Sequence, residues 1–337
     1  MRTAASEWVS LGHPDKLADY ITSHILDRII DADPGARYAV EVLVKDSAVI
    51  LAGEVTTRSY LTHEDYARWA AEAVRDVGYT AEYQRLWGAS NAISADALDV
   101  RCFIRGQSTD IARGVGVGWG DQGIFWGMAV ADPAHDYLPA DYWYARDIGR
   151  RLFKSGIGGL DIKTLVSTDG DTPYRVVAAV PLLSAEAEQT VCDLIRRAAG
   201  QSVEIVLNGT GRFACHGPVG DSGVTGRKLA VDFYGGNCRV GGGSPWGKDP
   251  TKADVTLNLL ARRLALAEIQ RGTTPTCFCS IACAIGQPDL EIALYDEQMR
   301  QIRYWRDASP ASEVINFLDL RRPEYARRCR EGLFTGV

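Results

Sequence analysis

Hydrophobic positions along the chain recur with two different periods, and their order predicts a protein in which helices and strands alternate. Residues 14–32 carry isoleucine and leucine side chains every three or four positions, which is typical of a helix with a buried face. Residues 38–45 and 48–57 alternate between apolar and polar side chains and are separated by a short polar turn, which predicts a hairpin. Residues 63–77 return to the helical period and stop at Gly78, a residue type common after the last turn of a helix.

The same alternation continues through the rest of the chain. Further helices are predicted at residues 141–154, 184–199, 250–270 and 311–319. Further strands are predicted at residues 99–105, 162–168, 174–182, 202–208, 228–234, 277–284 and 289–296. Pro250 suits the first turn of its helix, and Asp249 is expected to cap that helix. We therefore expect an α+β fold of three similar units, each a sheet with helices on one face, although no sequence repeat marks them.

Length and composition narrow the class of protein. The chain has 337 residues, which suggests more than one folded module, and its net charge is -6. A nucleic-acid binder usually carries an excess of positive charge, which this sequence lacks. No stretch of the sequence is long and apolar enough to span a bilayer. The N-terminus MRTAASEWVS lacks the features of a signal peptide, so we expect a cytoplasmic protein with no nucleic-acid or membrane partner.

Eight cysteines are scattered along the chain, and only three of them lie close together. Cys277, Cys279 and Cys283 occur in the apolar run TCFCSIACAI, which predicts a buried strand. We interpret them as small core residues of a protein in a reducing compartment rather than as metal ligands or disulfide partners.

The first segment with candidate chemistry is GHPDK, Gly12–Lys16, at the start of the first predicted helix. A helix N-terminus attracts phosphate through its free N–H groups and its dipole. His13 can donate a hydrogen bond to an anion, and Asp15 can hold a divalent cation. The alternative is a capped helix start whose charges face water.

A second segment is GDSGVTGRK, Gly220–Lys228. Its three glycines allow the backbone to turn tightly and to present N–H groups to an anion. Arg227 and Lys228 add two adjacent positive charges. A polar turn between strands is the alternative, but it explains the paired cations less well.

The third segment is GGGSPWGKDPTKAD, Gly241–Asp254. Lys248 and Lys252 are four residues apart and share one face of a helix start, with Asp254 in the first turns. Two lysines and a carboxylate at a helix N-terminus preceded by glycines suit a polyphosphate that carries magnesium. The segment also approaches the phosphate-loop pattern, but Asp249 stands where that pattern needs Ser or Thr, so we do not expect a phosphate-loop fold.

These motifs, in this order, resemble those of the S-adenosylmethionine synthetase (methionine adenosyltransferase) family. GHPDK, AGEVTT, GDQG, GTGRF, GDSGVTGRK and the GGGSPWGKDPTKAD block follow one another between about residues 6 and 286. The resemblance implies an α+β fold of three similar sheet-plus-helix domains with pseudo-threefold symmetry. It also implies a homodimer with active sites shared between subunits, which can pair into a tetramer. The expected sequence modules are 4–110, 118–215 and 217–337, and the family fold implies that the spatial domains interleave along the chain.

The resemblance implies a reaction in which the sulfur of L-methionine attacks C5′ of ATP to form S-adenosylmethionine. Tripolyphosphate leaves and is then hydrolysed to pyrophosphate and phosphate. A thioether carries no proton, so no general base is needed, and catalysis depends on positioning and on stabilising the charge of the leaving group. Mg²⁺ and K⁺ are the implied cofactors.

The family's functional residues transfer to matching positions of this sequence. Catalytic roles fall on His13, Lys163, Arg227, Lys228 and Lys248. ATP contacts fall on His13, Asp161, Lys163, Arg212, Phe213, Asp221, Arg227, Lys228, Ser244 and Lys248. Methionine contacts fall on Glu54, Gln107, Asp121, Asp221 and Lys252. Magnesium is expected at Asp15 and Asp254, and potassium at Glu41.

Some features depart from the family pattern and leave alternatives open. Leu11 replaces an acidic residue, Trp246 replaces a small one, and the glycine-rich stretch from Ser108 to Gly120 is several residues shorter. A related adenosyltransferase with altered substrate preference is therefore one alternative. A non-catalytic nucleotide-binding homologue is a second, although the charged phosphate ligands are retained. Glu41 and Glu54 could simply face water on their strands.

Overall fold

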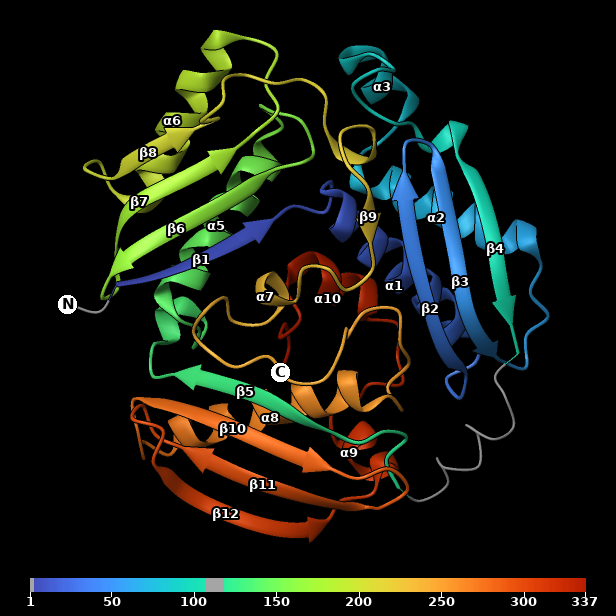
Figure 1. The fold of residues 1–337 in the computed structure, drawn as a ribbon, viewed down its shortest axis with the longest axis vertical. Helices are drawn as coiled ribbons and strands as arrows, with labels where there is room; N and C mark the ends of the chain where they lie inside the picture. The colour runs from blue at the N-terminus through green and yellow to red at the C-terminus, as the bar shows by residue number, and fades with distance from the viewer. Residues whose placement is uncertain (1–2, 107–117) are drawn as a thin grey trace.

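Three four-stranded sheets surround a common centre in the computed structural model, which describes residues 3–106 and 118–337 (Figure 1). Each sheet is packed against helices. Three short 3₁₀ turns lie between the larger elements, at Ala95–Ala97, Pro133–His135 and Gly217–Val219.

The first sheet joins the N-terminal hairpin to a short strand from much further along the chain. Its strands, in spatial order, are β4 (Asp99–Arg105), β3 (Ala48–Thr56), β2 (Arg37–Lys45) and β9 (Gly223–Val224). Strand β2 pairs antiparallel with β3 and β9, whereas β4 runs parallel to β3. The accompanying helices are α1 (Pro14–Ala32), α2 (His63–Val77) and α3 (Ala81–Trp87). Helix α2 lies between β3 and β4 in the chain, so the unit consists of the hairpin β2–β3, a helical crossover and the parallel strand β4.

The second sheet repeats this arrangement. Its strands, in spatial order, are β1 (Thr3–Val9), β6 (Lys163–Asp169), β7 (Thr172–Ala179) and β8 (Glu204–Leu207). Strands β1, β6 and β7 are antiparallel, and β8 is parallel to β7. Helices α5 (Ala140–Ser155) and α6 (Ala185–Ala199) pack against it.

The third sheet is antiparallel throughout. Its strands, in spatial order, are β12 (Gln301–Ala308), β11 (Asp289–Tyr295), β10 (Thr276–Cys283) and β5 (Gly123–Val130). Helix α8 (Ala253–Gln270) packs against β5 and β10, and α9 (Ala311–Phe317) contacts α8. Cys277 and Cys279 are buried and free in β10, as expected for core residues.

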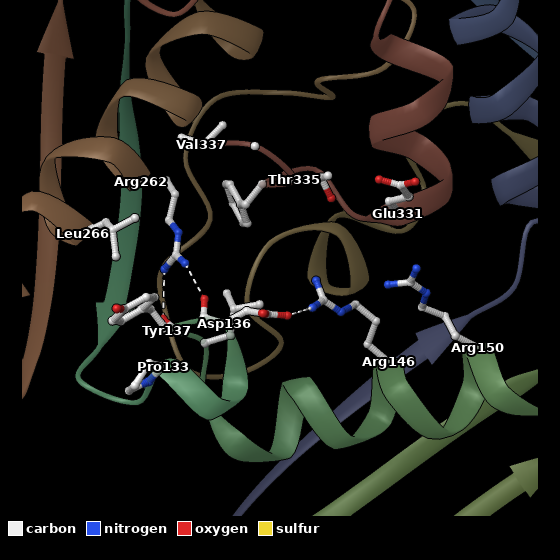
Figure 2. Close-up of a pocket in the computed structure, with 13 residues that line it drawn as sticks. Pro133, Asp136, Tyr137, Arg146, Arg150, Arg262, Leu266, Glu331, Thr335 and Val337 are labelled. Carbon is white, nitrogen blue, oxygen red and sulfur yellow. Dashed lines mark hydrogen bonds and ion pairs between the residues drawn. The ribbon is translucent and has the colours of Figure 1, made fainter.

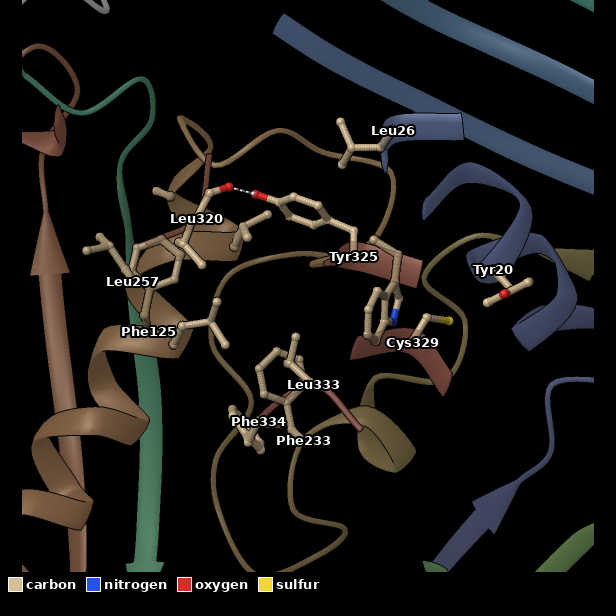
Figure 3. Close-up of a cluster of buried hydrophobic side chains, with 14 of the residues drawn as sticks. Tyr20, Leu26, Phe125, Phe233, Leu257, Leu320, Tyr325, Cys329, Leu333 and Phe334 are labelled. Atoms are coloured by element: carbon tan, nitrogen blue, oxygen red, sulfur yellow. Dashed lines mark hydrogen bonds between the residues drawn. The ribbon is translucent and has the colours of Figure 1, made fainter. Parts of the chain in front are cut away.

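The centre of the molecule holds α7 (Leu229–Asp232) and α10 (Tyr325–Glu331) (Figure 1). Around α10, Tyr325 and Phe334 belong to a continuous apolar cluster that includes Phe125 of the third sheet and Leu26 of α1 (Figure 3). The side chain of Tyr325 also donates a hydrogen bond to the Leu320 carbonyl at 2.7 Å. The C-terminal segment therefore packs between the first and third units.

Each sheet draws strands from two of the three expected sequence modules. Strand β1 of module 4–110 pairs with β6 of module 118–215, and β5 of module 118–215 pairs with β10 of module 217–337. Strand β9 of the last module pairs with β2 of the first. The modules therefore divide the sequence and not the three-dimensional structure.

Most predicted elements are present, and three predictions are wrong. Residues 228–234 are not a strand: they contain the single helical turn α7, because their buried apolar side chains pack in the crowded centre rather than in a sheet. Asp249 does not cap α8 and Pro250 does not lie in its first turn, because α8 begins at Ala253 with Lys252 at its N-cap. The Asp249 carboxylate instead accepts hydrogen bonds from the Tyr38 backbone N–H at 2.8 Å and from the Thr251 hydroxyl at 2.6 Å.

None of the helices in the described part of the chain combines the length and the apolar character that crossing a bilayer requires.

Candidate active site

His13 is the N-cap residue of α1, and its ring is almost completely buried. Pro14 at the first helical position fixes the backbone for the helix start. The His13 Nδ1 atom accepts a hydrogen bond from the Asp15 backbone N–H at 3.2 Å. Burial, together with the positive charges of Lys228 and Lys163, lowers the pKa of His13 to about 3. The imidazole is therefore neutral with its proton on Nε2, which leaves an N–H donor for an anion.

Asp15 ties this helix start to the segment Gly220–Lys228. Its carboxylate lies 2.5 Å from Lys228 Nζ and 3.5 Å from Arg227 Nε, and it accepts a hydrogen bond from the Val224 backbone N–H at 3.0 Å. Burial alone would raise the pKa of Asp15, but the bonds from Lys228 and Val224 outweigh it and lower the pKa. Asp15 is therefore a buried carboxylate held in its charged form.

Three further predicted residues lie within electrostatic reach of this group. The Asp161 carboxylate accepts a hydrogen bond from the Gly217 backbone N–H at 2.9 Å. Burial raises the pKa of Asp161 to about 6; Lys163 acts in the opposite sense, while Asp221 and Asp15 raise it further. The seven residues gathered here, which we call the His13 cluster, are His13, Asp15, Asp161, Lys163, Asp221, Arg227 and Lys228.

A second group of charges, which we call the Lys248 cluster, consists of Lys248, Asp254 and Glu41. Lys248 Nζ lies 2.5 Å from Asp254 Oδ2, and Asp254 Oδ1 accepts a hydrogen bond from the Gly243 backbone N–H at 2.7 Å. Desolvation raises the pKa of Glu41, and Lys248 partly opposes this. Asp121 lies near this cluster, because Asp121 and Asp254 both act on the pKa of Cys283, which burial raises to about 11.

The remaining predicted contacts are less closely connected. Ser244 lies beside the loop that carries Arg227, since a Cβ atom on Gly226 would come within 2.6 Å of the Ser244 Cβ. Arg212 instead lies 3.9 Å from Glu188 of α6. Four predicted contacts remain. The Phe213 carbonyl accepts a backbone hydrogen bond from Leu182 at 3.0 Å, Glu54 lies on β3, and Lys252 is the N-cap residue of α8. Gln107 lies outside the described residues.

The carboxylates of the two clusters fit a magnesium ion only if substrate phosphates also bind that ion. No group of three or more histidine, cysteine, aspartate or glutamate side chains in the described ranges could hold a metal ion. Asp15 and Asp254 each offer one carboxylate, and Mg²⁺ usually binds proteins through one or two carboxylates together with substrate phosphates and water. These two residues therefore fit a magnesium ion that arrives with a polyphosphate. Glu41 offers a single carboxylate for K⁺.

Sequence reasoning missed the charged residues directly behind the His13 cluster. Lys16, Asp19 and Asp232 are all buried, and Trp246 donates a hydrogen bond to Asp232 from its indole N–H at 2.8 Å. A signal was present, because Asp19 interrupts the apolar face of the first predicted helix. The position of Asp232 gave no comparable signal, since its segment had been interpreted as a strand.

A cavity of about 430 Å³ lies apart from both clusters and shares no residue with them (Figure 2). It is bordered by α5, α8 and the C-terminal segment, with Arg146 and Arg150 on one side and Arg262 on another. Arg146 pairs with Asp136 at 2.8 Å, and Arg262 donates to the backbone carbonyls of Asp136 and Tyr137. The arginines that carry these bonds are thus engaged in holding the 133–138 turn.

Comparisons with known proteins agree with this arrangement. Residues 2–108 match the model of the S-adenosylmethionine synthetase N-terminal domain, and residues 215–336 match that of the C-terminal domain. S-adenosylmethionine synthase 1 of Rhodospirillum rubrum is 35% identical over 367 aligned residues, covering 98% of this chain and 92% of that protein. The solved structure of an S-adenosylmethionine synthetase from Campylobacter jejuni, described as unusual, has a TM-score of 0.87 at 28% identity and covers 99% of this chain and 95% of its own.

Proposed function

Because this chain belongs to the S-adenosylmethionine synthetase family, we propose that the His13 and Lys248 clusters form the site at which it joins L-methionine to ATP. The activity is that of a methionine adenosyltransferase. The methionine sulfur forms a bond to C5′ of ATP while the C5′–O bond breaks, and the electron pair of that bond leaves with tripolyphosphate. The observation that carries the site assignment is that two distant segments of the chain meet around Asp15 and present His13, Arg227 and Lys228 together.

His13 acts on the leaving group. Its Nε2–H is directed by the hydrogen bond that Nδ1 accepts from Asp15, and its burial keeps water away from the donor. A hydrogen bond to the departing oxygen strengthens as negative charge grows there, so it stabilises the transition state more than the bound substrate.

The cations hold the phosphate chain. Lys228 and Lys248 are paired with carboxylates in the free protein and exchange these partners for phosphate oxygens, while Lys163 and Arg227 are already exposed to solvent. A charge-assisted hydrogen bond of this type contributes about 1.5–3 kcal/mol. When bound at Asp15 and Asp254, Mg²⁺ would neutralise charge on the phosphates.

Further contacts follow the family positions. We assign Asp161, Arg212, Phe213, Asp221 and Ser244 to the nucleotide. We assign Glu54, Gln107, Asp121, Asp221 and Lys252 to methionine. Glu41 is assigned to K⁺. Carboxylates such as Asp121 and Asp221 also suit the cationic sulfonium of the product.

The outer faces of the sheets support a homodimer with shared sites, and pairs of dimers would form a tetramer. Leu43 of the first sheet and Leu165 of the second are exposed and alternate with buried neighbours along their strands, and Phe103 of the first sheet and Ile124 of the third are exposed as well. Exposed apolar side chains on several sheets favour association through these faces. The two clusters would then come together from different protomers.

Incubation of the protein with ATP, L-methionine, Mg²⁺ and K⁺, followed by mass analysis, tests the proposal. We expect S-adenosylmethionine, pyrophosphate and phosphate to appear in equal amounts. Lys228→Met should abolish most of this product, whereas Lys154→Met on α5, outside both clusters, should not. Binding of ATP without formation of a sulfonium product would overturn the assignment.

A further inference from the structure

Directly behind the His13 cluster lies a second set of charges that faces the interior. Lys16 follows Asp15 in the chain but is only 3% exposed. Its Nζ atom lies 2.6 Å from Asp232 Oδ1 and 3.2 Å from Asp19 Oδ2, and it sits 4.3 Å from the centroid of the Trp246 ring. We call these four residues, Lys16, Asp19, Asp232 and Trp246, the Lys16 cluster.

The cluster contains one ammonium group and two carboxylates with almost no contact to water. Burial opposes the charge on Lys16, but Asp232, Cys329 and Asp19 outweigh burial and raise the pKa of Lys16. Burial raises the pKa of Asp19 to about 7, although Lys16 acts against this. Buried ion pairs are often no more stabilising than apolar side chains of similar volume. Stability alone therefore does not account for three buried ionisable groups at this place.

Two of its members hold the segment that carries Arg227 and Lys228. Asp19 Oδ1 accepts a hydrogen bond from the backbone N–H of Gly226 at 2.8 Å, immediately before Arg227. Asp232 ends the single turn α7, whose N-cap is Lys228, and bonds directly to Lys16. Lys16 thereby fixes both ends of the stretch from 226 to 232.

The third member holds the segment that carries Lys248. The Trp246 indole N–H donates to Asp232 Oδ2 at 2.8 Å, and its backbone N–H donates to the Ser244 hydroxyl at 3.1 Å. Trp246 is 2% exposed, so its ring is locked two residues before Lys248. Side chains held in this way place neighbouring charges within a few tenths of an ångström.

We propose that Lys16 is a positioning residue for the reaction: through Asp19 and Asp232 it sets the spacing between the helix start at His13 and the Arg227–Lys228 pair, and through Asp232 and Trp246 it fixes the segment that carries Lys248. This inference rests on the proposed function of the two clusters in binding the phosphate chain. Lys16 itself does not touch substrate, because its side chain is buried and its ammonium group is held by Asp19 and Asp232. Its effect is on the fit of the site to a polyphosphate.

Two variants test the proposal by removing contacts within the Lys16 cluster. Lys16→Met combined with Asp232→Asn removes the ion pair and keeps an acceptor for the Trp246 indole. Trp246→Phe keeps an aromatic ring beside Lys16 and removes the hydrogen bond to Asp232 together with part of the ring volume. The half-buried Trp143 of α5, whose ring packs in a tilted arrangement against His135, supplies the control Trp143→Phe, which removes the same atoms outside the cluster.

We expect the double variant to bind tripolyphosphate at least tenfold more weakly and to lose at least tenfold in kcat, while KM for methionine changes less than twofold. Trp246→Phe should show the same pattern at two- to fivefold, and Trp143→Phe should show neither. Calorimetry gives tripolyphosphate binding, and near-ultraviolet circular dichroism establishes that each variant is folded.

A folded double variant with unchanged tripolyphosphate binding and kcat would overturn the proposal. If the double variant does not fold, Trp246→Phe decides, and wild-type values for it would overturn the proposal equally. Tripolyphosphate binding is measured without turnover. A wild-type protein that binds tripolyphosphate but makes no S-adenosylmethionine would contradict the proposed function and leave the test of Lys16 intact.

Discussion

Two adjacent residues in the first turn of α1, Asp15 and Lys16, have opposite charge environments. Asp15 faces the His13 cluster, where Arg227 keeps half of its side chain exposed and Lys228 has one short ion pair. Lys16, the next residue, lies among fixed partners in a buried cluster that solvent does not reach. The buried charges around Lys16 therefore hold the framework, whereas the partly exposed Arg227 and Lys228 can change partners.

The exchangeable pairs resemble each other. Lys228 with Asp15 and Lys248 with Asp254 are each 2.5 Å apart, and each joins a proposed phosphate ligand to a proposed magnesium ligand. A lysine that leaves its carboxylate for phosphate leaves a negative charge behind, which a divalent cation can satisfy. Metal and polyphosphate should therefore bind to the outer clusters in a coupled manner, whereas the Lys16 cluster should not respond to either.

The largest effect is expected from removing the proton donor of the outer cluster. His13→Ala should lower kcat for adenosyl transfer by about 10²-fold or more, as loss of a donor to a developing oxyanion typically does. ATP binding should weaken by less than about tenfold, because the donor acts mainly in the transition state. Single-turnover kinetics and equilibrium binding measure the two quantities, and His24→Ala, on the same helix, is the control. Equal losses in rate and affinity would contradict the role of His13.

An intermediate effect is expected when the exchangeable lysines lose their carboxylate partners. In the Asp15→Asn, Asp254→Asn variant, metal-free tripolyphosphate should bind about tenfold more tightly than to the wild type, since Lys228 and Lys248 start unpaired. Added magnesium should then improve binding much less than it does in the wild type. Calorimetric titrations with EDTA or with magnesium measure both. Weaker metal-free binding in this variant would show that the pairs are structural, like those of Lys16.

The smallest effect is a fractional uptake of protons. The pKa of His13 is about 3 in the free protein, so the ring is neutral at pH 6. A bound polyanion favours the protonated ring and raises that pKa, so binding should take up protons, more at pH 6 than at pH 8. Titrations of tripolyphosphate in buffers of different ionisation enthalpy measure this uptake, and His13→Asn should remove it. An identical proton count for both proteins would exclude protonation of His13.

Periodic patterns predicted the elements that have one exposed face. The bounds of α1 and α2 agree with the expected ranges 14–32 and 63–77, because their apolar stripes and end signals are local. Strands β1, β5 and β12 were not predicted. Strands β1 and β5 pair with strands far away in the chain, whereas β12 pairs with the neighbouring β11 but is exposed along almost its whole length, so it shows no apolar alternation. Residues 228–234 were misread because a short apolar run in a crowded centre has no period of its own.

The sequence likewise predicted the residues of the candidate site that lie in local motifs, but not the contacts between distant segments. Motif residues such as His13, Asp15 and Lys228 were identifiable because glycines and charges mark anion-binding backbone locally. The partnership of Lys16 with Asp232 was not, because 216 residues separate the two in the chain. The packing of all three units together decides which charged side chains are buried, so a local sequence pattern does not predict them.

The pairing of β1 with β6 has a consequence for the protein as it is made. A ribosome that adds about 5–20 residues per second must synthesise about 150 residues after Val9, for roughly 8–30 s, before the partner strand emerges. Strand β5 must likewise wait for β10, which follows it by more than 140 residues. The second sheet can therefore be completed only after Leu207 has been made, the first after Val224 and the third after Ala308, so every sheet stays open until well over half of these 337 residues have been synthesised.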